Sequence, residues 1–140
     1  MISISNDKNR MKLLEIEKKS LTSMLDIQKN LNKQILSFLK NFLGDVKIDL
    51  NFDSENQVFK YIKETTEVLN KSNSNIDKIN LLLKRLNDII LNVNNPSVEK
   101  RIIQYNSEFD NKINIIYRNT NLIEEFLHKI SLLDLSEVLP

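Results

Sequence analysis

The stretch "NVNNP", residues 92–96, decides how this chain folds, because it separates two long helical patterns by only a few residues. Pro96 disfavours helical geometry at Asn95 and therefore ends the pattern before it. Proline also suits the first position of a helix, so a new helix is expected to begin at Pro96 with Asn95 as its cap. A turn this short forces the two flanking helices to run antiparallel.

The residues before the turn predict a helix over about 55–92, with Ser54 and Gln57 as a capping box at its start. Its stripe steps by alternating threes and fours, as one face of a helix does. The stripe is Val58, Ile62, Thr65, Leu69, Ser72, Ile76, Ile79, Leu83, Leu86, Ile90 and Val93. The segment "NKSNSN" (70–75) is a weak point, because Asn and Ser compete with the helical backbone for hydrogen bonds. We expect a continuous helix that can bend there; a break with a new cap at Ser74 is the alternative.

Two further runs have the same period and predict helices over about 7–43 and 96–131. The first stripe is Met11, Leu14, Glu17, Leu21, Met24, Gln28, Leu31, Ile35, Phe38 and Phe42, widened by Leu25, Leu36 and Leu39. The last stripe is Ile102, Tyr105, Phe109, Ile113, Ile116, Thr120, Ile123, Leu127 and Ile130. The expected fold is all-α, an up-down-up bundle of three long helices in a single domain, residues 1–140.

The connection between the first two helices, 44–53, has a different period. Val46, Ile48, Leu50 and Phe52 alternate with polar residues, which is typical of a half-buried strand. Gly44, the only glycine, suits a left-handed residue that ends the first helix. We expect an extended strap that covers the end of the bundle. The alternatives are strand pairing between two copies, which would make a homodimer, and irregular or helical structure.

Composition excludes several classes of protein. The net charge is +1, so the basic excess typical of nucleic-acid binders is missing. The sequence has no cysteine and no apolar run long enough to span a membrane. The N-terminus does not resemble a signal peptide, which favours a cytoplasmic protein. Asn, Ile and Lys are abundant and have AT-rich codons, which indicates a low-GC genome such as that of a Gram-positive bacterium or its phage.

Residues that could carry chemistry are few. Glu125 lies three residues before His128, the only histidine, in the Glu-x-x-His spacing of di-iron bundles, but one copy is only half of such a site. The pairs Lys84/Arg85 and Lys100/Arg101 could contact an acidic partner, although a solvated surface explains them as well. The glycine-rich loops and nucleophile turns of nucleotide-binding proteins and hydrolases are missing. We therefore expect no enzyme activity, no metal and no cofactor.

The patterns favour a non-enzymatic intracellular module that binds another protein, as an adaptor or a chaperone-like helical bundle. The alternative is a structural subunit of a larger homo-oligomeric assembly, such as a phage or cell-surface component. The apolar connection and the leucine-rich tail are the predicted partner-binding segments, because burying each such side chain is worth about 1.5–3 kcal/mol. The predicted binding residues are Val46, Ile48, Leu50, Phe52, Leu132, Leu133 and Leu135.

Overall fold

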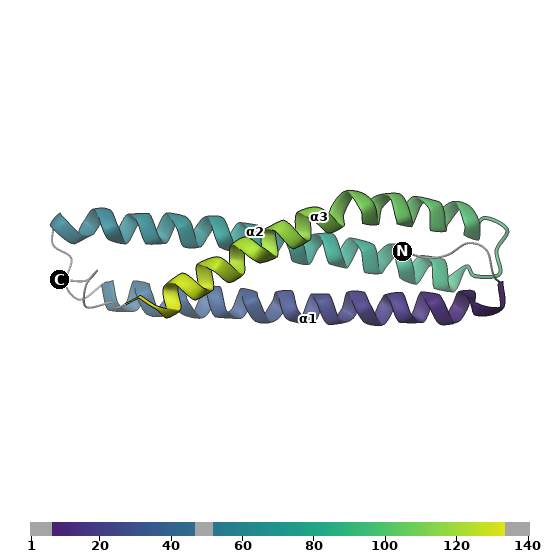
Figure 1. Ribbon diagram of the computed structural model, residues 1–140, viewed down its shortest axis with the longest axis horizontal. Coiled ribbons are helices and arrows are strands. Elements are labelled where there is room, and N and C mark those ends of the chain that lie inside the picture. Colours follow the sequence, from purple (N-terminus) through teal and green to yellow (C-terminus); the bar gives the residue numbers. More distant parts are fainter. Residues whose placement is uncertain (1–6, 47–51, 134–140) are drawn as a thin grey trace.

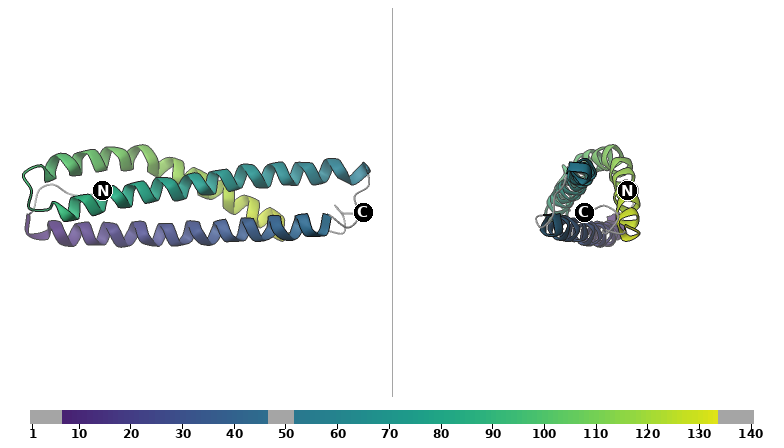
Figure 2. Two further views of the ribbon diagram at one scale, coloured as in Figure 1. Left: turned by 180° about the vertical axis from the view of Figure 1, so that it is seen from behind. Right: turned by 90° about the vertical axis from the view of Figure 1, so that its left-hand side faces the viewer.

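The computed structural model describes residues 7–46 and 52–133, with side chains described for 9–44 and 58–133. It contains three helices, α1 (Asp7–Val46), α2 (Phe52–Leu91) and α3 (Val98–Ser131). The chain runs up, down and up again, so helices that follow one another in the sequence are antiparallel (Figure 1). The end-on view in Figure 2 places the helices around a triangle, with α3 slanting across the other two. The expected all-α three-helix bundle is confirmed.

The helix boundaries at the first connection correct the sequence prediction. α1 continues through Gly44 to Val46, and Gly44 has no positive φ, so glycine does not end this helix. α2 begins at Phe52, which places Ser54 inside the helix rather than at its cap. The prediction of an extended segment over 44–53 is therefore wrong at both of its ends. The helices continue there because a helix satisfies its backbone hydrogen bonds internally. Residues 47–51 lie outside the described residues. α2 is continuous through 70–75, as expected.

The turn at 92–97 reverses the chain, but its cap differs from the prediction. α3 begins at Val98, two residues after Pro96, and Ser97 is its N-cap residue. The Asn95 side-chain oxygen accepts hydrogen bonds from the Ser97 amide and hydroxyl, both at 2.9 Å. Asn95 therefore stabilises the turn before the helix, a local hydrogen bond for which asparagine is well suited.

The core extends along the whole bundle and draws on all three helices. Near the α2–α3 turn, one cluster joins Leu14 and Leu21 of α1 to Leu86 of α2 and to Ile102 and Tyr105 of α3. The α2 stripe predicted from the sequence is too narrow, because α2 packs against both α1 and α3. Three buried apolar residues of α2 lie outside the predicted stripe: Val68, Leu82 and Ile89.

A polar layer crosses the middle of this apolar core. Asn75 of α2 is completely buried, and Gln28 of α1 is 3% exposed. The Asn75 amide donates to Gln28 Oε1 at 3.1 Å, and the Gln28 amide donates to Thr120 Oγ1 of α3 at 2.9 Å. Asn119 of α3 donates to Asn75 Oδ1 at 3.1 Å. The layer therefore satisfies its own polar groups and links all three helices.

Buried polar pairs of this kind favour one alignment of helices over others. An apolar stripe can slide by a turn and still find apolar partners, whereas Asn75 finds Gln28 and Thr120 at only one height. The segment 70–75, which looked like a weak point of α2, thus holds the residue that fixes the register. Its Ser72 is also fully buried and accepts a hydrogen bond from Asn32 of α1 at 3.0 Å.

A second polar contact between α1 and α3 involves Tyr105, which is 1% exposed. Its hydroxyl donates to Glu17 Oε1 at 3.0 Å. Burial raises the pKa of the Tyr105 phenol well above its ordinary value, and the negative charge and hydrogen bond of Glu17 raise it further. The folded protein therefore keeps this phenol protonated in alkaline solution.

Tyr105 should make the bundle less stable at alkaline pH. In the unfolded chain its phenol ionises near pH 10, while the raised pKa keeps it protonated in the folded state. The stability that it contributes is complete below about pH 10 and is lost as the pH rises further, because only the unfolded state releases the proton. In urea denaturation from pH 8 upward, the free energy of unfolding should fall more steeply with pH for the wild type than for Tyr105→Phe. Parallel declines would contradict this assignment.

Candidate functional site

Aromatic side chains gather at the end of the bundle where α1 ends and α2 begins. Phe38 and Phe42 stack with ring centroids 5.4 Å apart, and Phe38 meets Phe126 of α3 edge-on at 5.9 Å. Phe42 also contacts Tyr61 of α2 at 5.9 Å. Such ring pairs add roughly 0.5–1.5 kcal/mol beyond their buried area. The described side chains at this end are therefore firmly packed as far as Phe42 of α1 and Tyr61 of α2.

Among the described side chains of α1 and α2 at this end, three large apolar ones remain accessible to solvent. Leu36 and Leu43 of α1 are 45% and 38% exposed, and Phe59 of α2 is 59% exposed. Leu36 and Leu43 lie two turns apart and follow Asn32 around the side of α1 that faces α2, where Asn32 contacts Ser72. We name Leu36, Leu43 and Phe59 the hairpin-end patch.

Phe59 lies on the matching side of α2. It is four turns from Asn73, which accepts a hydrogen bond from Asn32 of α1 at 2.9 Å. The contact between the tilted rings of Phe42 and Tyr61 shows that these two residues lie at the same height along the bundle. Leu43 and Phe59 are within two residues of that pair, so they lie at nearly the same height. The hairpin-end patch therefore flanks the seam between α1 and α2.

Lysines surround the hairpin-end patch. Lys33 and Lys40 lie one turn from Leu36, and Lys63 lies one turn from Phe59, so all three neighbour the patch on the helix surface. All three are exposed. The apolar side chains thus have a cationic rim among the described side chains. Such a surface can bury an apolar face and pair with acidic groups around it.

The fold brings the two segments predicted to bind a partner to the same end of the bundle. Val46 is the last residue of α1 and Phe52 the first of α2. Leu132, directly after α3, is 73% exposed, and Leu133 is half-buried. Ile48, Leu50 and Leu135 lie outside the described residues. Figure 1 shows the yellow end of α3 approaching the same end as the α1–α2 connection.

In the described part of the chain, the residues of the Glu-x-x-His spacing do not gather with further acidic side chains. Glu124, Glu125 and His128 are all exposed on α3. Within residues 7–46 and 52–133, no three His, Asp or Glu side chains come close enough to hold a metal ion. The neighbouring Lys129 instead donates to Glu64 Oε2 of α2 at 2.9 Å and lies 5.4 Å from the ring centre of Tyr61. These contacts fasten the end of α3 to α2.

The arginines of the two basic pairs bind within the bundle. Arg85 of α2 donates to Glu108 of α3 at 3.2 Å, and Arg101 of α3 pairs with Asp88 of α2. Both ion pairs bridge α2 and α3 near the turn that joins them. These ion pairs on the surface between α2 and α3 explain the two arginines without an acidic partner.

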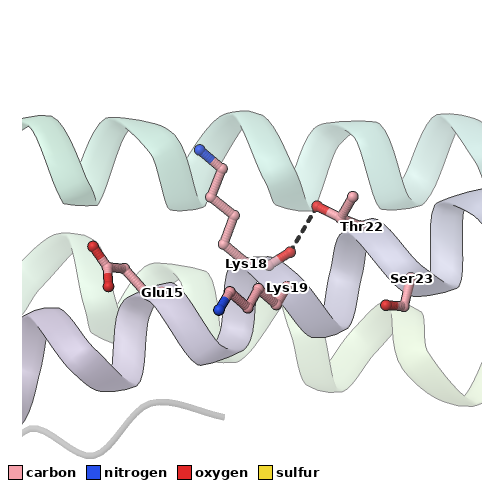
Figure 3. Close-up of a pocket in the computed structure, with 5 residues that line it drawn as sticks. All are labelled: Glu15, Lys18, Lys19, Thr22 and Ser23. Carbon is pink, nitrogen blue, oxygen red and sulfur yellow. Dashed lines mark hydrogen bonds between the residues drawn. The ribbon is translucent and has the colours of Figure 1, made fainter.

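A shallow hollow of about 490 Å³ lies on the outer side of α1 (Figure 3). Among the described residues it is lined by Glu15, Lys18, Lys19, Thr22 and Ser23. The Thr22 hydroxyl donates to the Lys18 carbonyl at 2.8 Å, a bond within one turn of helix. Figure 3 shows Lys18 and Lys19 extending in different directions, so their charges do not converge on one point.

None of the described helices combines the length and apolar character needed to cross a membrane. Comparison of the chain with protein-family models, curated proteins and solved structures found no match.

Proposed function

We propose that this protein is a non-enzymatic interaction module, and that its hairpin-end patch binds another protein. The observation that supports the proposal is the exposure of Leu36, Leu43 and Phe59 along the seam between α1 and α2, at the end of the bundle where Phe38, Phe42 and Tyr61 pack. Scattered apolar residues are normal on a protein surface, but a group with a polar rim is typical of interaction sites. An exposed aromatic residue such as Phe59 is a common energetic anchor of interaction sites.

The chemistry of the patch favours one kind of partner. An amphipathic helix can place its apolar face in the seam between two helices, in the manner of many helix-in-groove complexes. The exposed Lys33, Lys40 and Lys63 would then meet acidic residues at the edges of that helix. The proposed partner is therefore a protein with an acidic amphipathic helix, and the bundle acts as an adaptor or a chaperone-like holder.

The proposal is tested by removing the apolar surface of the patch without touching the core. Leu43→Ser with Phe59→Ser should abolish retention of the partner. The matched control is Leu91→Ser with Ile115→Ser, which removes exposed apolar surface (85% and 38%) elsewhere on the bundle. Tagged wild type and both variants would be recovered from the native cells and their bound proteins quantified by mass spectrometry, after circular dichroism shows equal helicity.

The expected result is a bound protein that is retained by the wild type and the control and lost from the patch variant. Identical sets of bound proteins in all three samples would contradict the proposal. The alternative function predicted from the sequence is that of a structural subunit in a large assembly. A ring or filament mass for the isolated wild type would support it.

A further inference from the structure

A shallow groove follows the seam between α2 and α3 on the surface of the bundle. It consists of three hollows of about 380, 400 and 290 Å³. The first two hollows share Ser74 in their lining, and the last two share Lys71, so the three join end to end. We name this surface, which is lined by residues within 64–81 of α2 and 112–129 of α3, the α2–α3 groove. The proposed function does not use it.

Ion pairs join the two helices at both ends of this groove. Glu108 and Lys129 of α3 each pair with a residue of α2, at 3.2 Å and 2.9 Å. Residues seven apart lie on nearly the same side of a helix. The residues between them at intervals of seven are Ile115 and Leu122, which therefore also lie along the seam. They are 38% and 39% exposed, so the middle of the seam has accessible apolar side chains where its ends have ion pairs.

Half-buried lysines line the middle of the groove. Lys71 lines one hollow together with Leu122, and Lys78 lines another together with Lys112. All three lysines are half-buried. None of the three takes part in an ion pair between described residues. Lys78 Nζ donates instead to Ser74 Oγ at 2.6 Å. The groove thus presents ammonium groups beside apolar side chains.

Two exposed carboxylates line the same groove. Asp77 of α2 lines the hollow that contains Lys112. Glu125 of α3 lines the hollow that contains Lys71. Neither carboxylate forms an ion pair with another residue of the described helices. The groove therefore holds charges of both signs that are not neutralised by an ion pair among the described residues.

The charges and apolar side chains of the groove are arranged symmetrically along α3. Lys112 lies seven residues before Asn119, and Glu125 lies six residues after it. Ile115 and Leu122 lie four residues before and three residues after Asn119. A two-fold axis that passes close to Asn119 at right angles to the helix therefore exchanges the heights of the two charges and of the two apolar residues.

The α2 side of the groove has the same symmetry at the same height. Lys71 and Asp77 lie three residues before and three residues after Ser74. The Asn119 amide donates at 3.1 Å to Asn75, the neighbour of Ser74, and Asn119 and Ser74 line one hollow. A single two-fold axis across the groove can therefore pass through the centres of both arrangements.

We infer that the α2–α3 groove binds a second copy of the chain in an antiparallel, two-fold symmetric dimer. The axis places α2 against α2 and α3 against α3 of the second copy, in opposite directions. Each half-buried lysine at the ends of the symmetric arrangement then meets a carboxylate, and the apolar side chains meet one another. The pairs between copies are Lys71 with Asp77, Lys112 with Glu125, and Ile115 with Leu122, each formed twice.

Charge selects this arrangement over the parallel one. A parallel dimer through the same groove would place α2 of one copy against α3 of the other at unchanged height. Lys71 would then face Leu122, and Lys78 would face Ile115, so buried ammonium groups would lack a counter-charge, which is unfavourable. In the antiparallel dimer the apolar side chains supply buried area and the charge pairs fix the orientation. The hairpin-end patch, on the seam between α1 and α2, stays open for a different protein.

Charge reversal tests the dimer. The first variant is Lys71→Glu with Lys112→Glu, and the second is Asp77→Lys with Glu125→Lys. In either variant alone the facing grooves carry the same charge, so sedimentation should show the mass falling from twice the chain mass of 16.4 kDa to the chain mass. In an equimolar mixture each groove again faces its opposite, and the dimer should return. The matched control, Lys12→Glu with Lys19→Glu on the exposed surface of α1, should stay dimeric.

A single thiol tests the direction of the two chains without changing any charge. The sequence has no cysteine, so Ser74→Cys places one thiol on the proposed axis, where it meets the same residue of the second copy. Oxidation of the two thiols by oxidised glutathione should link two chains through a disulfide. Ser23→Cys, on the exposed surface of α1, is the matched control and should link far more slowly.

The outcomes are distinct. Dimeric wild type, monomeric variants, a dimeric mixture and rapid linkage through position 74 support the inference. A wild type that stays monomeric up to millimolar concentration overturns it, as do variants that dimerise as the wild type does. A mixture of variants that are folded by circular dichroism but stay monomeric also overturns it. Equal linkage rates at positions 74 and 23 overturn the antiparallel arrangement. None of these outcomes depends on the partner of the hairpin-end patch.

Discussion

Replacing Ile116 by alanine should lower the free energy of unfolding by about 2–5 kcal/mol, the range for large-to-small changes in a packed core. Ile116 has no exposed surface and packs in a cluster with Leu25 of α1 and Ile79 of α2. The substitution removes three methyl or methylene groups from the contact of all three helices, and the surrounding side chains are too constrained to refill the space. The measurement is urea denaturation followed by circular dichroism at 222 nm.

The neighbouring Ile115 supplies the control, because it is the same residue type in the same helix but is 38% exposed. Ile115→Ala should lower the free energy of unfolding clearly less than Ile116→Ala does. Equal losses at the two positions would mean that the buried face of α3 has been assigned wrongly.

Replacing Asn75 by leucine should also destabilise the bundle strongly, although leucine is more apolar. The change leaves the Gln28 side-chain oxygen and the Asn119 amide without the partner that they have now. Gln28 is buried, and a buried polar group left without a hydrogen bond costs about 1–3 kcal/mol. Asn80→Leu on the exposed surface of α2 is the matched control and should change the unfolding midpoint little. An Asn75→Leu protein as stable as the wild type would show that the layer contributes nothing.

Replacing the whole layer should give the opposite result. Gln28→Leu, Asn75→Leu and Thr120→Val together convert most of the polar layer into apolar core, and such replacements are often neutral or stabilising. What the triple variant should lose is the unique alignment of the helices. Broadened amide resonances in its NMR spectrum, with stability retained, are the expected signature. A spectrum as sharp as that of the wild type would show that apolar packing alone fixes the register.

The fold could be predicted from the sequence because periodicity and turn chemistry agreed. Three runs of threes and fours, with Pro96 between two of them, leave few arrangements other than an up-down-up bundle. The boundaries were harder to predict, because alternation over 46–52 competes with the tendency of a helix to continue. At Gly44 the helix prevails, since glycine permits a left-handed conformation but does not require it.

The buried polar layer could be predicted only in part. Gln28 and Thr120 fall on the predicted stripes, but Asn75 lies beside the α2 stripe. Its burial follows from the position of α2 between two neighbours, which widens its buried face. Leu83, placed on the stripe, is only half-buried for the same reason, while the adjacent Leu82 is fully buried. A helix that contacts two others buries two adjacent stripes, and a single periodic pattern does not distinguish them.

The candidate site could be predicted as a region rather than as residues. The connection and the tail were predicted to bind a partner because both are apolar, and the fold places their described residues, Val46, Phe52 and Leu132, toward one end of the bundle. The sequence did not predict that Phe59 and Leu43 are exposed, because an apolar residue beside an apolar stripe is expected to belong to the core. A usable signal was present in Lys40 and Lys63, each one turn from one of these residues, because lysine marks the exposed edge of a helix.

The most direct test of the account is site-specific photo-crosslinking at the hairpin-end patch. A photoreactive amino acid would replace Phe59, or Leu91 as an exposed control at the other end of α2, in cells that make the protein. We predict a crosslink from position 59 to one other protein, through a peptide that is acidic and amphipathic, and no such product from position 91. Equal crosslinking of many proteins from both positions, or none from position 59, would contradict the proposed interaction site.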